Sequence, residues 1–127
     1  MSELTCLELG IVLWIVHVLV QAAFAGSALS PAYLTGPRDQ TLSPKGVLYP
    51  RATRALGNYV ENFAPFAAAD LGLMVTQHTG GWGATIWVLA RIVYIPLYVF
   101  GVAWVRTICW TVSIIGLLTM LARLAGI

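Results

Sequence analysis

The fold is decided by Arg51-Ala-Thr-Arg54-Ala-Leu-Gly-Asn58-Tyr-Val-Glu61-Asn62-Phe-Ala-Pro65-Phe66, a stretch in which charged and amide side chains recur within an otherwise apolar segment. At about 100° per residue, an α-helix places positions 51, 54, 58, 61 and 62 within an arc of roughly 100°. The opposite face is apolar. Because charged side chains inside a bilayer are costly unless they meet one another, a polar ligand or water, this polar stripe is a candidate functional site.

The composition of the whole chain is that of an integral membrane protein. Its 127 residues are 59% hydrophobic and only 9% charged, and its mean hydropathy is +0.83, well above what soluble domains show. The net charge of +2 comes from scattered basic residues without interleaved aromatics. We therefore expect no nucleic-acid partner.

The two cysteines predict neither a metal centre nor a disulfide framework. Cys6 and Cys109 lie in or beside apolar segments, and neither has a second cysteine or a histidine at the spacing of metal ligands. We expect buried, unreactive thiols and no bound metal.

Four apolar stretches predict four membrane-spanning helices, over residues 4–29, 51–76, 83–100 and 107–127. Each is close to the ~20 residues that a helix needs to cross ~30 Å of hydrocarbon. Residues 30–50 are rich in proline and glycine and predict a loop. Ala23-Phe24-Ala25 looks like a signal-peptide cleavage site, but no basic residue precedes it and the apolar run is long, so we expect a retained helix.

The basic residues predict the orientation in the membrane. They lie in or beside the first and third loops, as Arg38, Lys45, Arg51, Arg54 and Arg106, whereas the N-terminus and the second loop have none. Since basic residues favour the cytoplasmic side, we expect the first and third loops there. The expected fold is a single all-α domain over residues 1–127, a four-helix up-down bundle whose last three helices are neighbours in chain order.

A second polar stripe lies in the helix predicted over residues 83–100. It carries Arg91, Tyr94 and Tyr98 at spacings that share one helix face. Because the two helices run in opposite directions, the start of the first stripe lies level with the end of the second, and Arg106 follows just beyond. The alternative is that the arginines snorkel to the interface, that Glu61 pairs with Arg91, and that the tyrosines pack against lipid.

A small ligand with charges of both signs suits these side chains. Arginines bind carboxylates in a bidentate manner, a glutamate receives an ammonium group, and a cation or hydroxyl beside a thiol favours its thiolate. Glutathione has two carboxylates, one ammonium group and a thiol. An open membrane flank would admit an apolar co-substrate.

The pattern of both stripes resembles the MAPEG family, the membrane-associated proteins of eicosanoid and glutathione metabolism. The matching residues are Arg51-x-x-Arg54-Ala-x-x-Asn58-x-x-Glu61-Asn62-x-x-Pro65-Phe66 and, downstream, Ala90-Arg91-x-x-Tyr94-x-x-x-Tyr98. The resemblance covers nearly the whole chain. It implies a homotrimer that binds glutathione between subunits near the cytoplasmic side. The similarity is to bacterial members, which implies the bacterial inner membrane.

The resemblance also implies an activity and roles for individual residues. The activity would be that of a membrane-bound, glutathione-dependent transferase or peroxidase acting on a lipophilic electrophile or hydroperoxide. Arg106 and Tyr94 are the expected catalytic residues, although Arg106 lies one residue further from Tyr98 than in leukotriene synthase. The expected glutathione-binding residues are Arg51, Arg54, Asn58, Glu61, Asn62, Arg91, Tyr94 and Tyr98.

Two other functions are compatible with the sequence. A non-catalytic membrane subunit or scaffold would keep the fold and use the polar stripe to bind lipid or another membrane protein. A small transporter is disfavoured, because no inverted repeat is visible and the charges cluster on one side of the membrane.

Two charged residues lie outside the stripes, near the other membrane surface. Asp70 and Arg123 fall at comparable depths in their predicted helices. We expect an ion pair between them, because isolated charges inside a membrane are costly.

Overall fold

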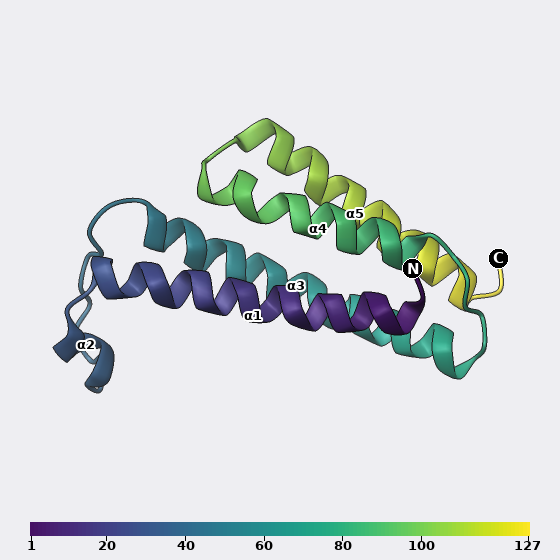
Figure 1. Ribbon diagram of the computed structural model, residues 1–127, viewed down its shortest axis with the longest axis horizontal. Coiled ribbons are helices and arrows are strands. Elements are labelled where there is room, and N and C mark those ends of the chain that lie inside the picture. Colours follow the sequence, from purple (N-terminus) through teal and green to yellow (C-terminus); the bar gives the residue numbers. More distant parts are fainter.

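The computed structural model describes residues 1–127 as five α-helices with no strand (Figure 1). The predicted all-α fold class is confirmed, and each of the four predicted long helices is present. The helices are α1 (Glu3–Ala28), α2 (Pro31–Thr35), α3 (Leu48–Val75), α4 (Gly83–Val99) and α5 (Ala103–Leu124).

The starts of α3 and α5 differ most from prediction. Helix α3 begins at Leu48 and includes Pro50, which lies in the first turn, where a backbone N–H has no helical partner. Helix α5 begins at Ala103 instead of residue 107. Gly101 has φ of 75°, and the N–H of Val102 donates to the carbonyl of Leu97 at 2.9 Å, so the chain reverses in few residues after α4.

Helix α2 was not predicted, because the prolines and glycines around it indicated only a loop. The side chain of Ser30 caps it by accepting a hydrogen bond from the N–H of Tyr33 at 3.3 Å. Pro31 occupies the first turn, where proline is well tolerated. A Ser-Pro pair therefore starts a short helix here.

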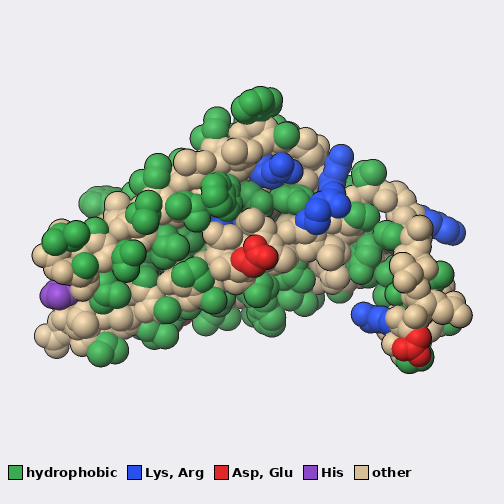
Figure 2. Space-filling model, turned by 180° about the vertical axis from the view of Figure 1, so that it is seen from behind, with side chains coloured by type: hydrophobic (Ala, Val, Ile, Leu, Met, Phe, Trp, Pro, Cys, Tyr) green, Lys and Arg blue, Asp and Glu red, His purple; other side chains and the backbone are tan.

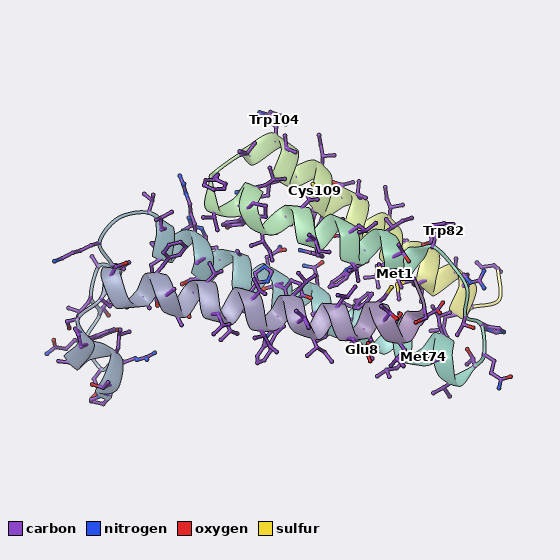
Figure 3. The ribbon with its side chains drawn as sticks, in the orientation of Figure 1. Met1, Glu8, Met74, Trp82, Trp104 and Cys109 are labelled. Atoms are coloured by element: carbon purple, nitrogen blue, oxygen red, sulfur yellow. The ribbon has the colours of Figure 1, made fainter.

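Two helices qualify as membrane spans by length and apolar composition. They are α1, with 26 residues, and α5, with 22, while α4 is a shorter apolar helix. Trp82 and Trp104 project outward from opposite ends of the α4 and α5 pair (Figure 3), and are 76% and 85% exposed. These features indicate a membrane protein. The crossing by all four long helices stays a prediction.

The long helices pack mainly as two pairs, α1 with α3 and α4 with α5 (Figure 1). The expected neighbours in chain order are therefore found for α4 and α5, whereas α3 packs chiefly on α1 and makes fewer contacts with α4. The long connection that contains α2 allows α3 to return along α1. The up-down bundle and the homotrimer stay predictions.

Two glycines allow the backbones of α4 and α5 to approach closely. A Cβ atom at Gly83 would lie 2.6 Å from the carbonyl oxygen of Gly116, and one at Gly116 would lie 2.8 Å from the carbonyl oxygen of Gly83. Real Cβ atoms are essentially never found so close to another atom. Small residues at such crossings are typical of membrane helices.

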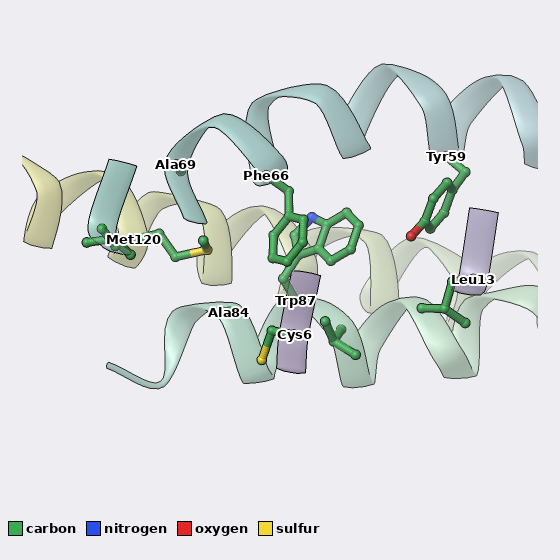
Figure 4. Close-up of a cluster of buried hydrophobic side chains, with 10 residues drawn as sticks. Cys6, Leu13, Tyr59, Phe66, Ala69, Ala84, Trp87 and Met120 are labelled. Carbon is green, nitrogen blue, oxygen red and sulfur yellow. The ribbon is translucent and has the colours of Figure 1, made fainter. Parts of the chain in front are cut away.

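Stacked aromatic rings form the core between α1, α3 and α4 (Figure 4). Phe66 and Trp87 lie face to face with ring centroids 3.9 Å apart, and both are fully buried. The hydroxyl of Tyr59 donates to the carbonyl of Gly10 at 2.6 Å, which joins α3 to α1. This core fixes the position of α4 beside the polar stripe of α3.

The loop between α3 and α4 is held by side chains from both ends of the chain. The N–H of Gly80 donates to the Glu3 carboxylate at 2.7 Å. The guanidinium group of Arg123 donates to the carbonyls of His78 and Thr79, at 3.2 and 2.7 Å. This loop is therefore tied to α1 and to α5.

The expected ion pair between Asp70 and Arg123 is wrong. Arg123 binds the loop carbonyls instead, because its long side chain reaches the end of the membrane-embedded region. Asp70 is fully buried, and neither of its carboxylate oxygens has a hydrogen-bond partner.

Candidate functional site

A polar pocket of about 370 Å³ lies where α3 faces α4 and α5. It is lined by Arg54, Gly57, Asn58, Glu61, Tyr94, Tyr98 and Arg106. Six of these seven residues belong to the set expected from the sequence. The structure therefore brings the two polar stripes and the start of α5 around one space.

The α3 wall of the pocket follows from helical spacing. Arg54, Asn58 and Glu61 recur every three or four residues and so lie on the same face. Gly57 was missed by the sequence reasoning, although its spacing of three from Arg54 and four from Glu61 puts it on this face. No atom lies within 4 Å of a Cβ atom built at Gly57, so its lack of a side chain widens the pocket.

The opposite wall consists of two buried tyrosines and an arginine. The rings of Tyr94 and Tyr98 have centroids 5.6 Å apart and pack on Ala55 of α3. The guanidinium carbon of Arg106 lies 4.8 Å from the centroid of the Tyr98 ring. The tight turn at Gly101 brings Arg106 back over this ring, because α5 starts only two residues later.

Two of the expected site residues lie beside the pocket. Arg51 donates from Nη1 to the carbonyl of Val99 at 3.2 Å and so joins the start of α3 to the end of α4. The amide nitrogen of Asn62 donates to the backbone carbonyl of Asn58 at 2.8 Å within α3. Neither residue is among those that line the pocket.

Arg91 lies behind the pocket and is fully buried. Its Nη1 donates to the side-chain oxygen of Asn58 at 2.8 Å. Its guanidinium carbon lies 5.5 Å from the ring centroid of Trp87 and 5.2 Å from that of Tyr94. The alternative pairing of Arg91 with Glu61 is therefore replaced by a hydrogen bond to an amide.

A second lobe of about 290 Å³ continues the pocket along α5. It is lined by Asn58, Tyr94 and Arg106, which it shares with the polar pocket, and by Thr107 and Trp110. The last two were missed, although Trp110 follows Arg106 by four residues and so lies on the same helix face. A group held by the shared residues would face both lobes.

The pocket carries a positive balance of charge. Two arginines, Arg54 and Arg106, and one glutamate, Glu61, line it. Figure 2 shows basic side chains beside an acidic one on a largely apolar face. Such a site suits a small ligand that has an excess of negative charge and one positive group.

The structure describes no group of three or more histidine, cysteine, aspartate or glutamate side chains that could hold a metal ion. Both cysteines are free; Cys6 is buried and Cys109 is half-buried. The polar groups that line the pocket are two guanidinium groups, two phenol hydroxyls, one amide and one carboxylate.

Comparison with protein-family models identifies the family of this chain. A search of curated proteins finds none that matches the chain. Residues 4–126 match the MAPEG family. Since this match covers nearly all of the 127 residues and includes both polar stripes, the chain belongs to the MAPEG family.

Proposed function

We propose that this protein is a membrane-bound, glutathione-dependent transferase or peroxidase that acts on a lipophilic electrophile or hydroperoxide. Membership of the MAPEG family supports glutathione-related chemistry at the level of the family. The observation that carries the finer proposal is the pocket itself, because five motif residues and Arg106, from three helices, line one space.

The charges of the pocket match those of glutathione. In this proposal Arg54 binds a carboxylate, and Glu61, two helical turns further along α3, receives the ammonium group. Asn58 lies between them and completes the α3 wall. Arg51 and Asn62 support this wall from outside the pocket, through their bonds to Val99 and to the α3 backbone.

The catalytic residues in this proposal are Arg106 and Tyr94, with Tyr98 beside them. A guanidinium group and a phenol hydroxyl near the sulfur favour the thiolate, whose proton passes to water. For an electrophile, the sulfur forms a C–S bond while the leaving group departs with the bonding electrons. For a hydroperoxide, the thiolate attacks the terminal oxygen as the O–O bond breaks, which gives a sulfenic acid and an alkoxide that takes a proton from water to become the alcohol. A second glutathione thiol then attacks the sulfenic sulfur, which gives the disulfide and releases the oxygen as water.

We further propose that residues 1–127 form one four-helix membrane domain that assembles as a homotrimer in the bacterial inner membrane. The first and third loops would be cytoplasmic, and the pocket lies near them. Its open side leaves room for a neighbouring subunit. Exposed apolar side chains along α1 and α5, such as Leu19 and Ile108, support contact with lipid and with lipophilic substrates.

Calorimetric titration of glutathione into the detergent-purified protein tests the proposal. We expect micromolar to millimolar binding that is lost in Arg54→Ala and Glu61→Gln. Arg123→Ala is the matched control, because this arginine lies at the α3–α4 loop and should leave affinity unchanged. Full affinity in both pocket variants would refute the site. No binding to the unaltered protein would favour the scaffold function.

A further inference from the structure

We infer that Arg91 is a positioning residue that orients the amide of Asn58, so that its NH2 group faces the pocket and binds an anionic group of the ligand. The inference rests on the proposed function and revises the role expected for Arg91. Arg91 is fully buried and is not among the residues that line the pocket. Its hydrogen bonds therefore do not reach a ligand, and it can position the ligand only through another residue.

The hydrogen bond between the two side chains fixes the orientation of the amide. A guanidinium group has five N–H donors and no acceptor. Arg91 donates from Nη1 to Asn58 at 2.8 Å, so the amide oxygen must face Arg91. An amide turned the other way would place its NH2 group against the N–H groups of Arg91, and no hydrogen bond could form. The Asn58 nitrogen is therefore left to face the pocket, which Asn58 lines together with the second lobe.

Arg91 is held rigidly enough to set this orientation. Its guanidinium group lies between the rings of Trp87 and Tyr94, with centroids 5.5 and 5.2 Å away. Trp87 is itself fully buried and stacked on Phe66 at 3.9 Å. One arginine thus contacts both the amide on α3 and the tyrosine ring on α4 that line the pocket.

The charge of Arg91 adds to the preference for an anion. Its Nε and Nη2 have no hydrogen-bond partner, and no carboxylate pairs with it. A buried cation without a counterion gives a positive potential that water screens poorly. The ligand group nearest Asn58 is therefore a carboxylate or a thiolate. The ammonium group is left for Glu61, one turn further along α3.

Asn58→Asp tests the orientation directly. The aspartate keeps an oxygen facing Arg91 but presents a second oxygen to the pocket in place of the NH2 group. We expect an unchanged or higher melting temperature, because the buried cation gains a counterion, together with glutathione affinity weakened about tenfold or more. Tighter binding would overturn the inference, since it would mean that Asn58 accepts a hydrogen bond from the ammonium group.

A double-mutant cycle tests whether Arg91 acts through Asn58. Arg91→Met removes a buried, unpaired charge and keeps the length of the side chain, so the variant should fold. We expect it to weaken glutathione binding about tenfold in the unaltered protein and less than about twofold in the Asn58→Ala background. Equal losses in both backgrounds would overturn the inference. Arg123→Met is the control for removing an arginine.

Two further measurements distinguish which ligand group Asn58 faces and whether the inference or the proposed function fails. With S-methylglutathione, the effect of Arg91→Met disappears if Asn58 faces the thiolate and persists if it faces a carboxylate; both results support the inference. If the unaltered protein does not bind glutathione, the proposed function and the inference fail together. If it binds and Arg91→Met binds equally well, only the inference fails.

Discussion

Gly116→Ala should destabilise the protein, although alanine is the better helix former. A Cβ atom at this position lies 2.8 Å from the carbonyl oxygen of Gly83 and 3.0 Å from the N–H nitrogen of Trp87. Both are backbone atoms, so the clash cannot be relieved by a change of side-chain rotamer. Ordinary contact begins at 3.4 Å, so α4 and α5 must separate by 3.4 minus 2.8, or 0.6 Å.

The size of the effect follows from two opposing contributions. Inserting a methyl group into a packed contact costs about 1–3 kcal/mol. Replacing a glycine inside a helix by alanine stabilises the helix by about 1 kcal/mol. The expected net loss is about 1 kcal/mol. Gly26→Ala in α1 is the matched control, because no atom lies within 4 Å of its Cβ position and only the gain remains.

Thermal unfolding of the two variants in the same detergent measures the difference. We expect Gly116→Ala to melt below the unaltered protein and Gly26→Ala to melt at or above it. The separation of α4 and α5 also moves Arg106 relative to Tyr98, so catalytic turnover should fall in the first variant only. Equal melting temperatures for both alanine variants would refute the reasoning about this crossing.

Three other variants test single contacts. Tyr59→Phe removes the 2.6 Å bond to the carbonyl of Gly10 and should cost about 1 kcal/mol in thermal unfolding; an unchanged melting temperature would show that the bond contributes nothing. Asp70→Asn removes a buried carboxylate without a partner, and should raise the melting temperature at neutral pH, whereas a lower value would reveal a partner for the charge. Arg106→Gln should weaken thiolate stabilisation, so that the thiolate absorbance of bound glutathione develops at higher pH; an unmoved titration would remove Arg106 from the mechanism.

The long helices and the two polar stripes were predictable because both depend on local patterns. Apolar length gives a membrane helix, and helical spacing puts Arg54, Asn58 and Glu61 on one face. Antiparallel order then places them level with Tyr94 and Tyr98. Five of the seven residues that line the pocket follow from these steps alone, and Arg106 was expected just beyond them.

The remaining features depend on contacts that periodicity does not encode. Spacing places Arg91 on the same face as Tyr94, but only packing against Trp87 decides that it lies behind the pocket. Depth along a helix suggested that Asp70 meets Arg123, whereas the reach of the arginine side chain carries it to the loop. The pairing of α3 with α1 likewise depends on the long connection between them. The amino-acid composition of this connection does not determine the path that it takes.

The α3–α4 loop anchors one end of α4, because the N–H of Gly80 in this loop donates to Glu3 of α1. The pocket lies near the other end of α4. There α3 and α4 are joined by the hydrogen bond from Arg51 to the Val99 carbonyl and by the packing of Tyr94 and Tyr98 on Ala55. A helix of 17 residues is about 25 Å long, so a tilt of about one degree displaces its far end by roughly 0.4 Å. We therefore expect the width of the pocket to change with bilayer thickness.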